Sequence, residues 1–211
     1  MHDDITIPDY SDETLLRAGF SAEPADGVVL LQALGAARSR SRILALRGLV
    51  RHEAVDETIW LRCLDDEDVD VRREALTQVS QHPPTTAIAQ RVTTLLGDPD
   101  ALVVDGAAFA LGEFLYPGAV DALCRVARDH EDARCREAAI AALGAIGDDE
   151  AREVIIAALE DKPPVRRRAI VALANFEGPD IDAALERASE DRDWQVRAAV
   201  SQLGRDDESD A

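Results

Sequence analysis

The chain has 211 residues, enough for one substantial domain, and its apolar residues are mostly Ala, Leu and Val, which favour closely packed helices over strands. Only 4% of the residues are aromatic, so the predicted core is built from small aliphatic side chains. There is no apolar run of about 18 residues and no basic-then-apolar N-terminus. We therefore expect no transmembrane helix, no signal peptide and a cytoplasmic location.

The formal net charge of −19 arises from 42 acidic and 23 basic residues, and Lys162 is the only lysine. Such a surface repels itself in dilute buffer, but in molar salt the Debye length falls to about 3 Å and the repulsion is largely screened. Acid excess with few lysines resembles the proteins of halophilic archaea that accumulate salt. A GC-rich genome alone would explain arginine in place of lysine, but not the acid excess. We therefore expect a halophilic archaeal source.

The first 23 residues lie outside the repeating pattern described below. Within them, Ser11 is a suitable N-cap for a short helix that begins at Asp12 and carries Leu15 and Leu16. We predict that residues 1–23 form an N-terminal extension whose short helix packs on the first repeat as a lid.

From residue 24 onward one short pattern recurs: an apolar residue, Arg, two variable positions, Ala, and then a small residue followed by an apolar one. The arginine position falls at 42, 72, 104, 136, 166 and 197, with valine in place of arginine at 104. The corresponding spacings are 30, 32, 32, 30 and 31 residues. Near-constant spacing over six copies predicts a stack of equivalent structural units.

Between these copies lies a second apolar pattern with helical periodicity, first seen from Val28 to Leu34. Each copy is therefore a pair of helices, and turn sequences such as His82-Pro83-Pro84 separate the helices. The predicted fold is all-α: an α-solenoid, armadillo-like in architecture, of about six helix pairs over residues 24–204. Residues 205–211 are mostly acidic and are predicted to be a disordered tail.

Two features of the repeat predict contacts. Ala and Gly positions share one face of the second helix, and we expect them to let that helix approach the first helix closely. An aspartate also precedes four of the second helices, and its carboxylate is placed to cap the helix and to face the arginine of its own or an adjacent repeat. These aspartates are Asp68, Asp100, Asp132 and Asp193.

The repeat resembles the short HEAT repeats of phycobiliprotein lyase subunits (PBS lyase HEAT-like repeats). Their hallmark Asp-x-x-Val-Arg-x-x-Ala-x-x-Ala-Leu-Gly is most clearly seen from Asp132 to Arg136 and from Ala142 to Gly144. The resemblance covers residues 24 to 204 and implies the solenoid architecture. It implies little about function, because the hallmark residues are those that hold the fold together.

Deoxyhypusine hydroxylases are HEAT-repeat enzymes that bind two irons through His-Glu pairs directly after the Val-Arg of the second helix. None of the corresponding positions here contains histidine; they are Arg73-Glu74, Asp105-Gly106, Glu137-Ala138 and Arg167-Arg168. The chain has only four histidines, and His52 and His130 are expected in turns. We therefore predict no metal site of this kind.

A bilin lyase-like enzyme is a second alternative, supported only by the family resemblance, because no cluster of His, Tyr, Trp and carboxylate is placed to hold a pigment. Trp60 and Trp194 are interpreted first as packing residues. The cysteines Cys63, Cys124 and Cys135 have no CxxC spacing and are expected to be reduced, buried residues. No catalytic residues, metal or organic cofactor are predicted.

In such solenoids the second helices line the concave face, and arginine and aromatic residues favour binding there. Our candidate binding positions on this face are Arg47, Arg51, Arg73, Phe109, Arg134, Arg167, Arg168, Asn175 and Trp194. In one hypothesis the arginines at the two ends of the groove receive an acidic segment of another protein. In the alternative hypothesis they pair with nearby acids of the chain.

We therefore predict a non-catalytic scaffold or adaptor that binds another protein; the sequence leaves open the identity of that partner and the oligomeric state of this chain. Nucleic acid is a third class of partner, because some HEAT-like proteins bind DNA along an arginine-rich face. The net charge of −19 opposes attraction to phosphate, and high salt would weaken such contacts further.

Overall fold

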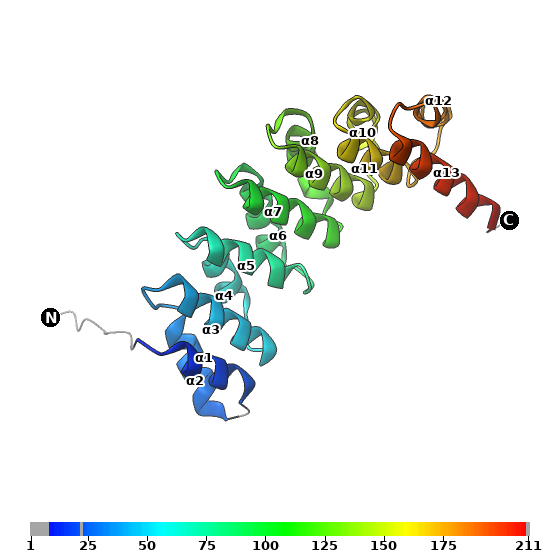
Figure 1. Cartoon of the computed structure of the whole chain (residues 1–211). Coiled ribbons are helices and arrows are strands. Elements are labelled where there is room, and N and C mark those ends of the chain that lie inside the picture. Colours follow the sequence, from blue (N-terminus) through cyan, green and yellow to red (C-terminus); the bar gives the residue numbers. More distant parts are fainter. Residues whose placement is uncertain (1–8, 22, 210–211) are drawn as a thin grey trace. The chain divides into compact units, whose positions relative to one another are not determined.

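The computed structural model describes residues 9–21 and 23–209, with side chains described through residue 203. Within these residues the chain forms thirteen α-helices and four short 3₁₀ segments, and no strand, which confirms the all-α prediction (Figure 1). In the described part of the chain, no helix is both long enough and apolar enough to cross a bilayer. The chain divides into two compact units, Met1–Arg91 (unit 1) and Val92–Ala211 (unit 2).

Unit 1 contains a lid helix and two complete helix pairs, followed by most of α6 (Thr86–Thr94). The lid helix α1 begins after Ser11, whose side chain accepts the Thr14 backbone N–H at 3.2 Å, and it packs on both helices of the first pair. The short N-terminal helix predicted from the sequence is therefore present. The bounds are α1 (Asp12–Phe20), α2 (Pro24–Ala33), α3 (Ser39–Arg51), α4 (Glu57–Leu64) and α5 (Val69–Val79).

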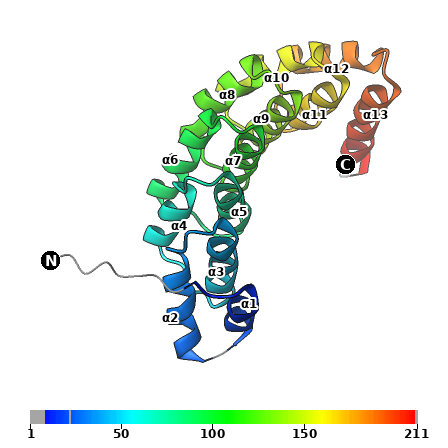
Figure 2. The ribbon, with the colours of Figure 1, turned by 60° about the vertical axis from the view of Figure 1, so that its left-hand side comes forward.

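Unit 2 continues with the end of α6 and then alternates first and second helices. The second helices α7, α9, α11 and α13 pack on one another in succession, and the first helices α8, α10 and α12 lie beside them in a separate layer (Figure 2). The bounds are α7 (Ala101–Glu113), α8 (Val120–Asp129), α9 (Ala133–Ile146), α10 (Arg152–Ala157), α11 (Pro163–Leu173), α12 (Pro179–Ser189) and α13 (Trp194–Ser209), with 3₁₀ segments η1 (Leu95–Gly97), η2 (Pro117–Ala119), η3 (Asp149–Ala151) and η4 (Ala158–Glu160).

In chain order the helices after α1 form six successive pairs, from α2–α3 to α12–α13, as the repeat spacing predicts. The tail differs from its prediction: α13 continues to Ser209, through residues 205–209 that the sequence analysis assigned to a disordered tail. An established helix adds residues at little free-energy cost, and no Gly or Pro occurs between 205 and 209 to stop it. Residues 210 and 211, like residues 1–8 at the start of the chain, lie outside the described residues.

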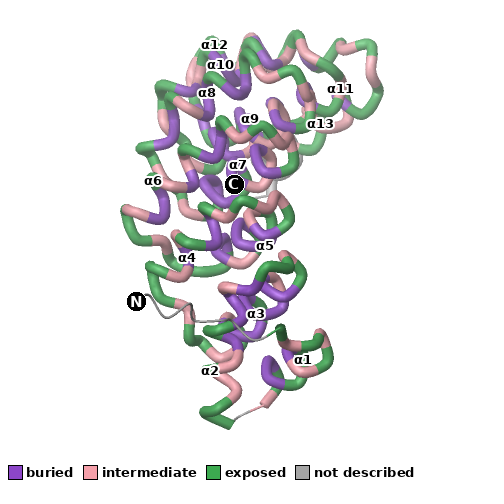
Figure 3. The backbone as a smooth tube through the Cα atoms, turned by 90° about the vertical axis from the view of Figure 1, so that its left-hand side faces the viewer, coloured by how far each residue is buried: buried purple, intermediate pink, exposed green. Residues whose placement is uncertain are grey.

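The core consists of aliphatic residues on the sides of helices that face one another, and the turns between helices are mostly exposed (Figure 3). Leu46 and Leu49 in unit 1, and Leu111, Ile140 and Ile170 in unit 2, are fully buried examples. The three cysteines are buried free thiols, as predicted, and burial raises the pKa of Cys63 and of Cys135 to about 11.

The small residues of the repeat act differently from our expectation. In unit 2 they bring second helices close to one another: a Cβ on Gly112 would lie 3.1 Å from Ala142 Cα, and one on Gly144 would lie 2.7 Å from Ala172 Cα. In unit 1, by contrast, a glycine of this kind faces the first helix of its own pair, because a Cβ on Gly48 would meet the Leu30 side chain at 2.8 Å. The glycines therefore set the spacing along the row of second helices more than the spacing within a pair.

Several repeat arginines bind an aspartate of the next helix pair and a backbone carbonyl before their own helix. We call this set of contacts the arginine clamp. Arg42 binds both carboxylate oxygens of Asp66 at 2.7 and 2.8 Å and donates to the Ala36 carbonyl at 2.9 Å. In unit 2, Arg136 binds Asp161 and Arg166 binds Asp191 in the same bidentate manner, at 2.6 to 2.9 Å. The clamp joins a second helix to the turn between the helices of the next pair.

The repeat arginines do not bind the capping aspartates that the sequence analysis predicted, but a different aspartate in the same turn. The predicted capping aspartates do cap their helices; for example, Asp100 accepts the backbone N–H groups of Leu102 and Val103. However, the clamp carboxylate at Asp66 or Asp191 lies two positions before the capping aspartate and also accepts that residue's backbone N–H. The arginine lies one turn inside its own helix, so its guanidinium extends past the cap toward the neighbouring turn.

One repeat lacks both members of the clamp. Val104 replaces the arginine and is buried, and His130 occupies the position of the clamp aspartate. His130 Nδ1 accepts the Asp132 backbone N–H at 3.1 Å, the role that a carboxylate oxygen has in the other turns. Loss of the guanidinium therefore coincides with loss of the carboxylate, which avoids leaving a buried charge without its partner.

Candidate binding groove of unit 2

The sequence placed nine candidate binding residues on the second helices, and the structure distributes them over the two units. Arg47, Arg51 and Arg73 belong to unit 1, and the other six belong to unit 2. The two sets are therefore considered separately.

In unit 1, Arg47 is held by an ion pair inside the chain. Its guanidinium donates to the two carboxylate oxygens of Glu74 at 2.8 and 2.6 Å, and Glu74 retains only 9% of its accessible surface. Gln78 donates a further hydrogen bond to Glu74 at 2.7 Å. Although burial acts against ionisation, the Arg47 and Gln78 hydrogen bonds hold the pKa of Glu74 below its ordinary value. Arg47 therefore stabilises the packing of α3 against α5.

The other two arginines of unit 1 also have partners within the chain. Arg51 Nη1 donates to the Gly19 carbonyl at 2.9 Å, and its guanidinium lies 4.0 Å from the centre of the Phe20 ring, so that it fastens the end of α1 to α3. Arg73 forms an exposed ion pair with Asp70, one turn earlier on α5, at 3.0 Å. In unit 1 the pairing hypothesis therefore describes the arginines better than the hypothesis of a free basic surface.

In unit 2 the second helices instead expose large apolar side chains. Phe109 on α7 retains 54% of its accessible surface, Val171 on α11 retains 51% and Trp194 at the start of α13 retains 67%. Trp60, in unit 1, is buried and contacts the His82 ring, which confirms its assignment as a packing residue. The same assignment is wrong for Trp194, because the first residue of α13 lies at the rim of the helix row rather than inside it.

These side chains border two pockets that adjoin along the row. The pocket between α7 and α9 has a volume of about 520 Å³, with Phe109 at its side and small residues as its floor. Its lining comprises Asp105, Phe109, Gly112, Glu113, Arg134, Glu137, Ala138, Ala141, Ala142, Ala145 and Arg168. The floor is formed where Gly112 lets α7 and α9 approach closely.

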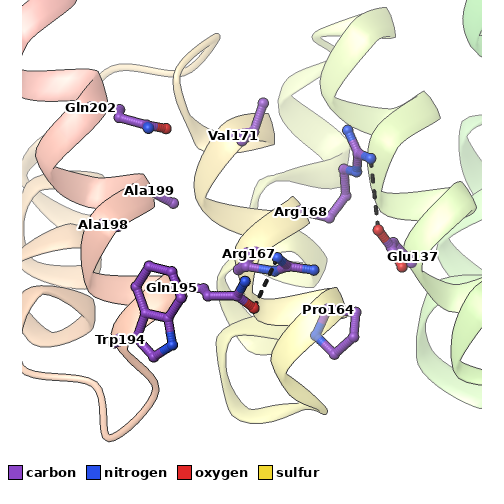
Figure 4. A pocket seen from close by; sticks show the side chains of 10 residues that line it. All are labelled: Glu137, Pro164, Arg167, Arg168, Val171, Trp194, Gln195, Ala198, Ala199 and Gln202. Carbon is purple, nitrogen blue, oxygen red and sulfur yellow. Dashed lines mark hydrogen bonds and ion pairs between the residues drawn. The ribbon is translucent and has the colours of Figure 1, made fainter.

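The second pocket lies between α11 and α13 and has a volume of about 420 Å³. Figure 4 shows Trp194 and Gln195 on α13 beside Pro164 and Arg167 on α11, with Glu137 contributed by α9. Val171, Ala198, Ala199, Gln202 and Arg168 complete its lining. Glu137 and Arg168 line both pockets, and we call the combined surface the unit-2 groove.

The arginines of the groove make weaker contacts within the chain than those of the clamp. Arg168 lies 3.6 Å from Glu137, and Arg167 donates to the Gln195 side chain at 3.1 Å (Figure 4). Arg134 is bound by Asp132 at 2.8 Å and remains exposed, and this contact lowers the pKa of Asp132 to about 2. Apart from that capping pair, the groove charges interact at longer distance or through a neutral amide.

Asn175 has a structural contact rather than a position in either pocket. Its side-chain amide donates to the Gly144 carbonyl at 2.8 Å and so ties the end of α11 to α9. Of the six candidate residues in unit 2, the structure therefore brings together Phe109, Arg134, Arg167, Arg168 and Trp194, and it separates Asn175 from them.

Several residues of the groove were not among the candidates, and a sequence signal marks three of them, Ala141, Val171 and Glu137. Ala141 and Val171 occupy the same repeat position as Phe109, five residues after the arginine position (109 after 104, 141 after 136, 171 after 166). Glu137 follows its arginine directly. A selection that considers only arginine and aromatic residues overlooks aliphatic residues at the same repeat position and an acidic residue next to the arginine position.

Asp105 lines the pocket between α7 and α9, and its surroundings raise its pKa. Burial on α7 raises its pKa, nearby Glu137 and Asp132 add to this effect, and Arg134 opposes it. His52, His82 and His130 lie at turns as predicted, and His2 lies outside the described residues. Among the described residues, no group of three or more His, Cys, Asp or Glu side chains could hold a metal ion.

Comparison with protein-family models identifies the class of protein. The model for HEAT repeats matches residues 57–144, 88–165 and 126–204, which together span well over half of the chain. The chain therefore belongs to the HEAT-repeat family, as the sequence resemblance predicted. No curated protein matches the chain significantly.

Solved structures with the same fold include a natural enzyme complex and engineered proteins. The complex of CpcE and CpcF of phycocyanin lyase from Nostoc sp. PCC7120 matches with 20% identity and a TM-score of 0.63, over 92% of this chain and 79% of that chain. An engineered protein matches with 22% identity and a TM-score of 0.63 (84% and 94% of the chains). A designed armadillo repeat protein in complex with the peptide (KR)4 matches with 16% identity and a TM-score of 0.56 (92% and 99%). At these identities the likeness shows the solenoid fold alone.

Proposed function

We propose that this chain is a non-catalytic scaffold or adaptor that binds a segment of another protein along the unit-2 groove, without metal or organic cofactor. The observation that carries the proposal is the exposure of Phe109, Val171 and Trp194 on the second helices of one unit, beside two adjoining pockets. Aromatic and aliphatic side chains that remain open to solvent in a concave site are typical anchors for protein partners.

The fold supports the same proposal. Second helices packed in succession present a continuous surface, and one of the structural neighbours is a designed repeat protein in complex with a peptide. Another neighbour is the complex of CpcE and CpcF of phycocyanin lyase. Binding of a protein segment requires no more than the apolar and charged side chains that the groove contains.

A photo-crosslinking residue at position 109 or 171 tests the proposal in extracts at the native salt concentration. We expect both positions to crosslink to the same segment of the same protein. Position 125 on the exposed side of α8 is the matched control and should not give this product. With the purified partner, the double substitution Phe109→Ser and Trp194→Ser should weaken binding by about tenfold or more while leaving the melting temperature unchanged. Equal crosslinking from position 125 would contradict the proposal.

We also infer that the chain works in the concentrated salt of a cytosol such as that of halophilic archaea. Support comes from the net charge of −19 and the single lysine. Helical circular dichroism should be lost below about 0.2 M salt, because the acidic surface is then no longer screened. A melting temperature that is the same in dilute and molar KCl would refute this inference.

A further inference from the structure

The charges of the unit-2 groove change sign along the row of second helices. Directly after the arginine position, α7 carries Asp105 and α9 carries Glu137, whereas α11 carries Arg167 and Arg168. Glu113 adds a further negative charge on α7, and Arg134 is engaged by Asp132. One end of the groove is therefore acidic and the other is basic.

An apolar line runs beside these charges. It consists of Phe109, Ala141 and Val171, one from each of three successive second helices. Axes of packed helices lie about 8–10 Å apart, so the line is about 16–20 Å long. This length corresponds to about 11–13 residues of an α-helix at 1.5 Å per residue.

A helix fits this groove better than an extended segment. An extended chain must find partners for its backbone N–H and C=O groups. The arginines of the groove already have partners in the chain: Arg168 with Glu137, Arg167 with Gln195 and Arg134 with Asp132. A helix satisfies its own backbone groups, and the floor of alanines leaves room for its apolar face.

We propose that the unit-2 groove binds an amphipathic helix of the partner whose apolar face lies on Phe109, Ala141 and Val171, with basic side chains over α7 and α9 and acidic side chains over α11. The negative C-terminal end of such a helix is favoured toward Arg167 and Arg168. This inference rests on the proposed function and adds the chemistry of the bound segment. The hypothesis from the sequence was an acidic segment, whereas the segment proposed here carries basic side chains in one half and acidic side chains in the other.

Three tryptophan-free peptides of equal length and identical apolar positions test the proposal with the full chain. One has a basic half followed by an acidic half, one is acidic throughout and one is basic throughout. Binding is followed by tryptophan emission, because Trp194 is exposed in the groove and Trp60 is buried. The substitution Trp194→Phe should abolish the signal. We expect the mixed peptide to bind at least about tenfold more tightly than either uniform peptide.

A charge reversal sharpens the test. Arg167→Glu with Arg168→Glu should transfer the preference to the basic peptide. The matched control, Arg125→Glu with Arg128→Glu on the exposed side of α8, changes the net charge equally and should leave the preference unchanged. A mixed peptide with proline at its centre, which cannot form an uninterrupted helix, should bind at least about tenfold more weakly.

The outcomes separate the two proposals. Equal binding of the mixed peptide and a uniform peptide, or binding that changes equally in both charge-reversed proteins, would overturn the mixed-charge helix and leave the scaffold proposal standing. Undiminished binding of the proline peptide would overturn the helical form. Binding of none of the peptides would also overturn the inference, and crosslinking from positions 109 and 171 would then decide the scaffold proposal independently.

Discussion

In unit 1 the polar side chains of the second helices α3 and α5 are occupied by contacts within the chain, whereas in unit 2 the second helices leave Phe109, Val171 and Trp194 open to solvent. Unit 1 does expose apolar residues, but they lie on α1 and α2. Both units use the arginine clamp. The comparison shows that the same repeat position can hold a neighbouring helix in one copy and remain available for recognition in another.

The clamp should be equally important in both units. Arg42→Ala and Arg166→Ala each leave a mostly buried aspartate without its guanidinium, so we expect each to lower the free energy of unfolding by about 3 kcal/mol. Urea denaturation followed by circular dichroism measures this loss. Arg187→Ala, an exposed arginine on α12, is the control and should change stability by less than about 0.5 kcal/mol. A loss below about 1 kcal/mol in either unit would show that the clamp is dispensable there.

The clamp also has a pH signature. Its hydrogen bonds hold the pKa of Asp191 and of Asp161 below their ordinary values. A carboxylate with a lowered pKa contributes stability above the ordinary value of about 3.9, and that contribution is lost as the pH falls. The stability difference between the wild-type chain and Arg166→Ala should therefore be full at pH 7 and smaller at pH 3. A constant difference over this range would contradict the ion-pair explanation.

The groove arginines should distinguish the two units. Arg47→Ser leaves Glu74 buried with only Gln78 as its partner, and should lower the stability by about 2 kcal/mol. Arg168→Ser in unit 2 removes a long, exposed contact and should change stability by less than about 0.5 kcal/mol. In a Trp194→Phe background the emission of buried Trp60 measures the unfolding of unit 1 for Arg47→Ser, and circular dichroism measures the stability of the Arg168→Ser variant. Equal losses of stability from the two substitutions would contradict the difference between the two units.

A smaller effect is expected where α7 ends. Leu115 has a φ of 49°, and the backbone N–H groups of Leu115 and Tyr116 donate to the carbonyls of Gly112 and Leu111, a Schellman arrangement that favours glycine at Leu115. Leu115→Gly should raise the stability by about 1 kcal/mol, because glycine adopts this conformation without strain. Glu53 ends α3 with a φ of 54° and the same arrangement, so Glu53→Gly is the matched variant in unit 1. Destabilisation by both substitutions would show that the side chains make compensating contacts.

The smallest expected effect concerns Asp105, where stability and recognition oppose each other. Burial raises its pKa, so folding is disfavoured as the pH rises through that value. Asp105→Asn should therefore raise the melting temperature slightly at pH 7 and have no effect where the carboxyl is already protonated. The same substitution should weaken binding of the mixed-charge peptide at pH 7. An increase in stability without loss of binding would remove Asp105 from the groove's recognition surface.

The arginine spacing and the capping aspartates were sufficient to predict the helix pairs and the family, because helix periodicity, caps and turns are encoded locally. The arginine partners depended on the tertiary structure: the clamp joins Arg166 to Asp191, and Arg47 is held by Glu74 on the next second helix. Likewise, Trp194 and Trp60 were both interpreted first as packing residues from the sequence, and the tertiary structure leaves Trp194 exposed and buries Trp60. A side chain stays open to solvent when no neighbouring helix covers it, and that depends on residues about 30 positions away.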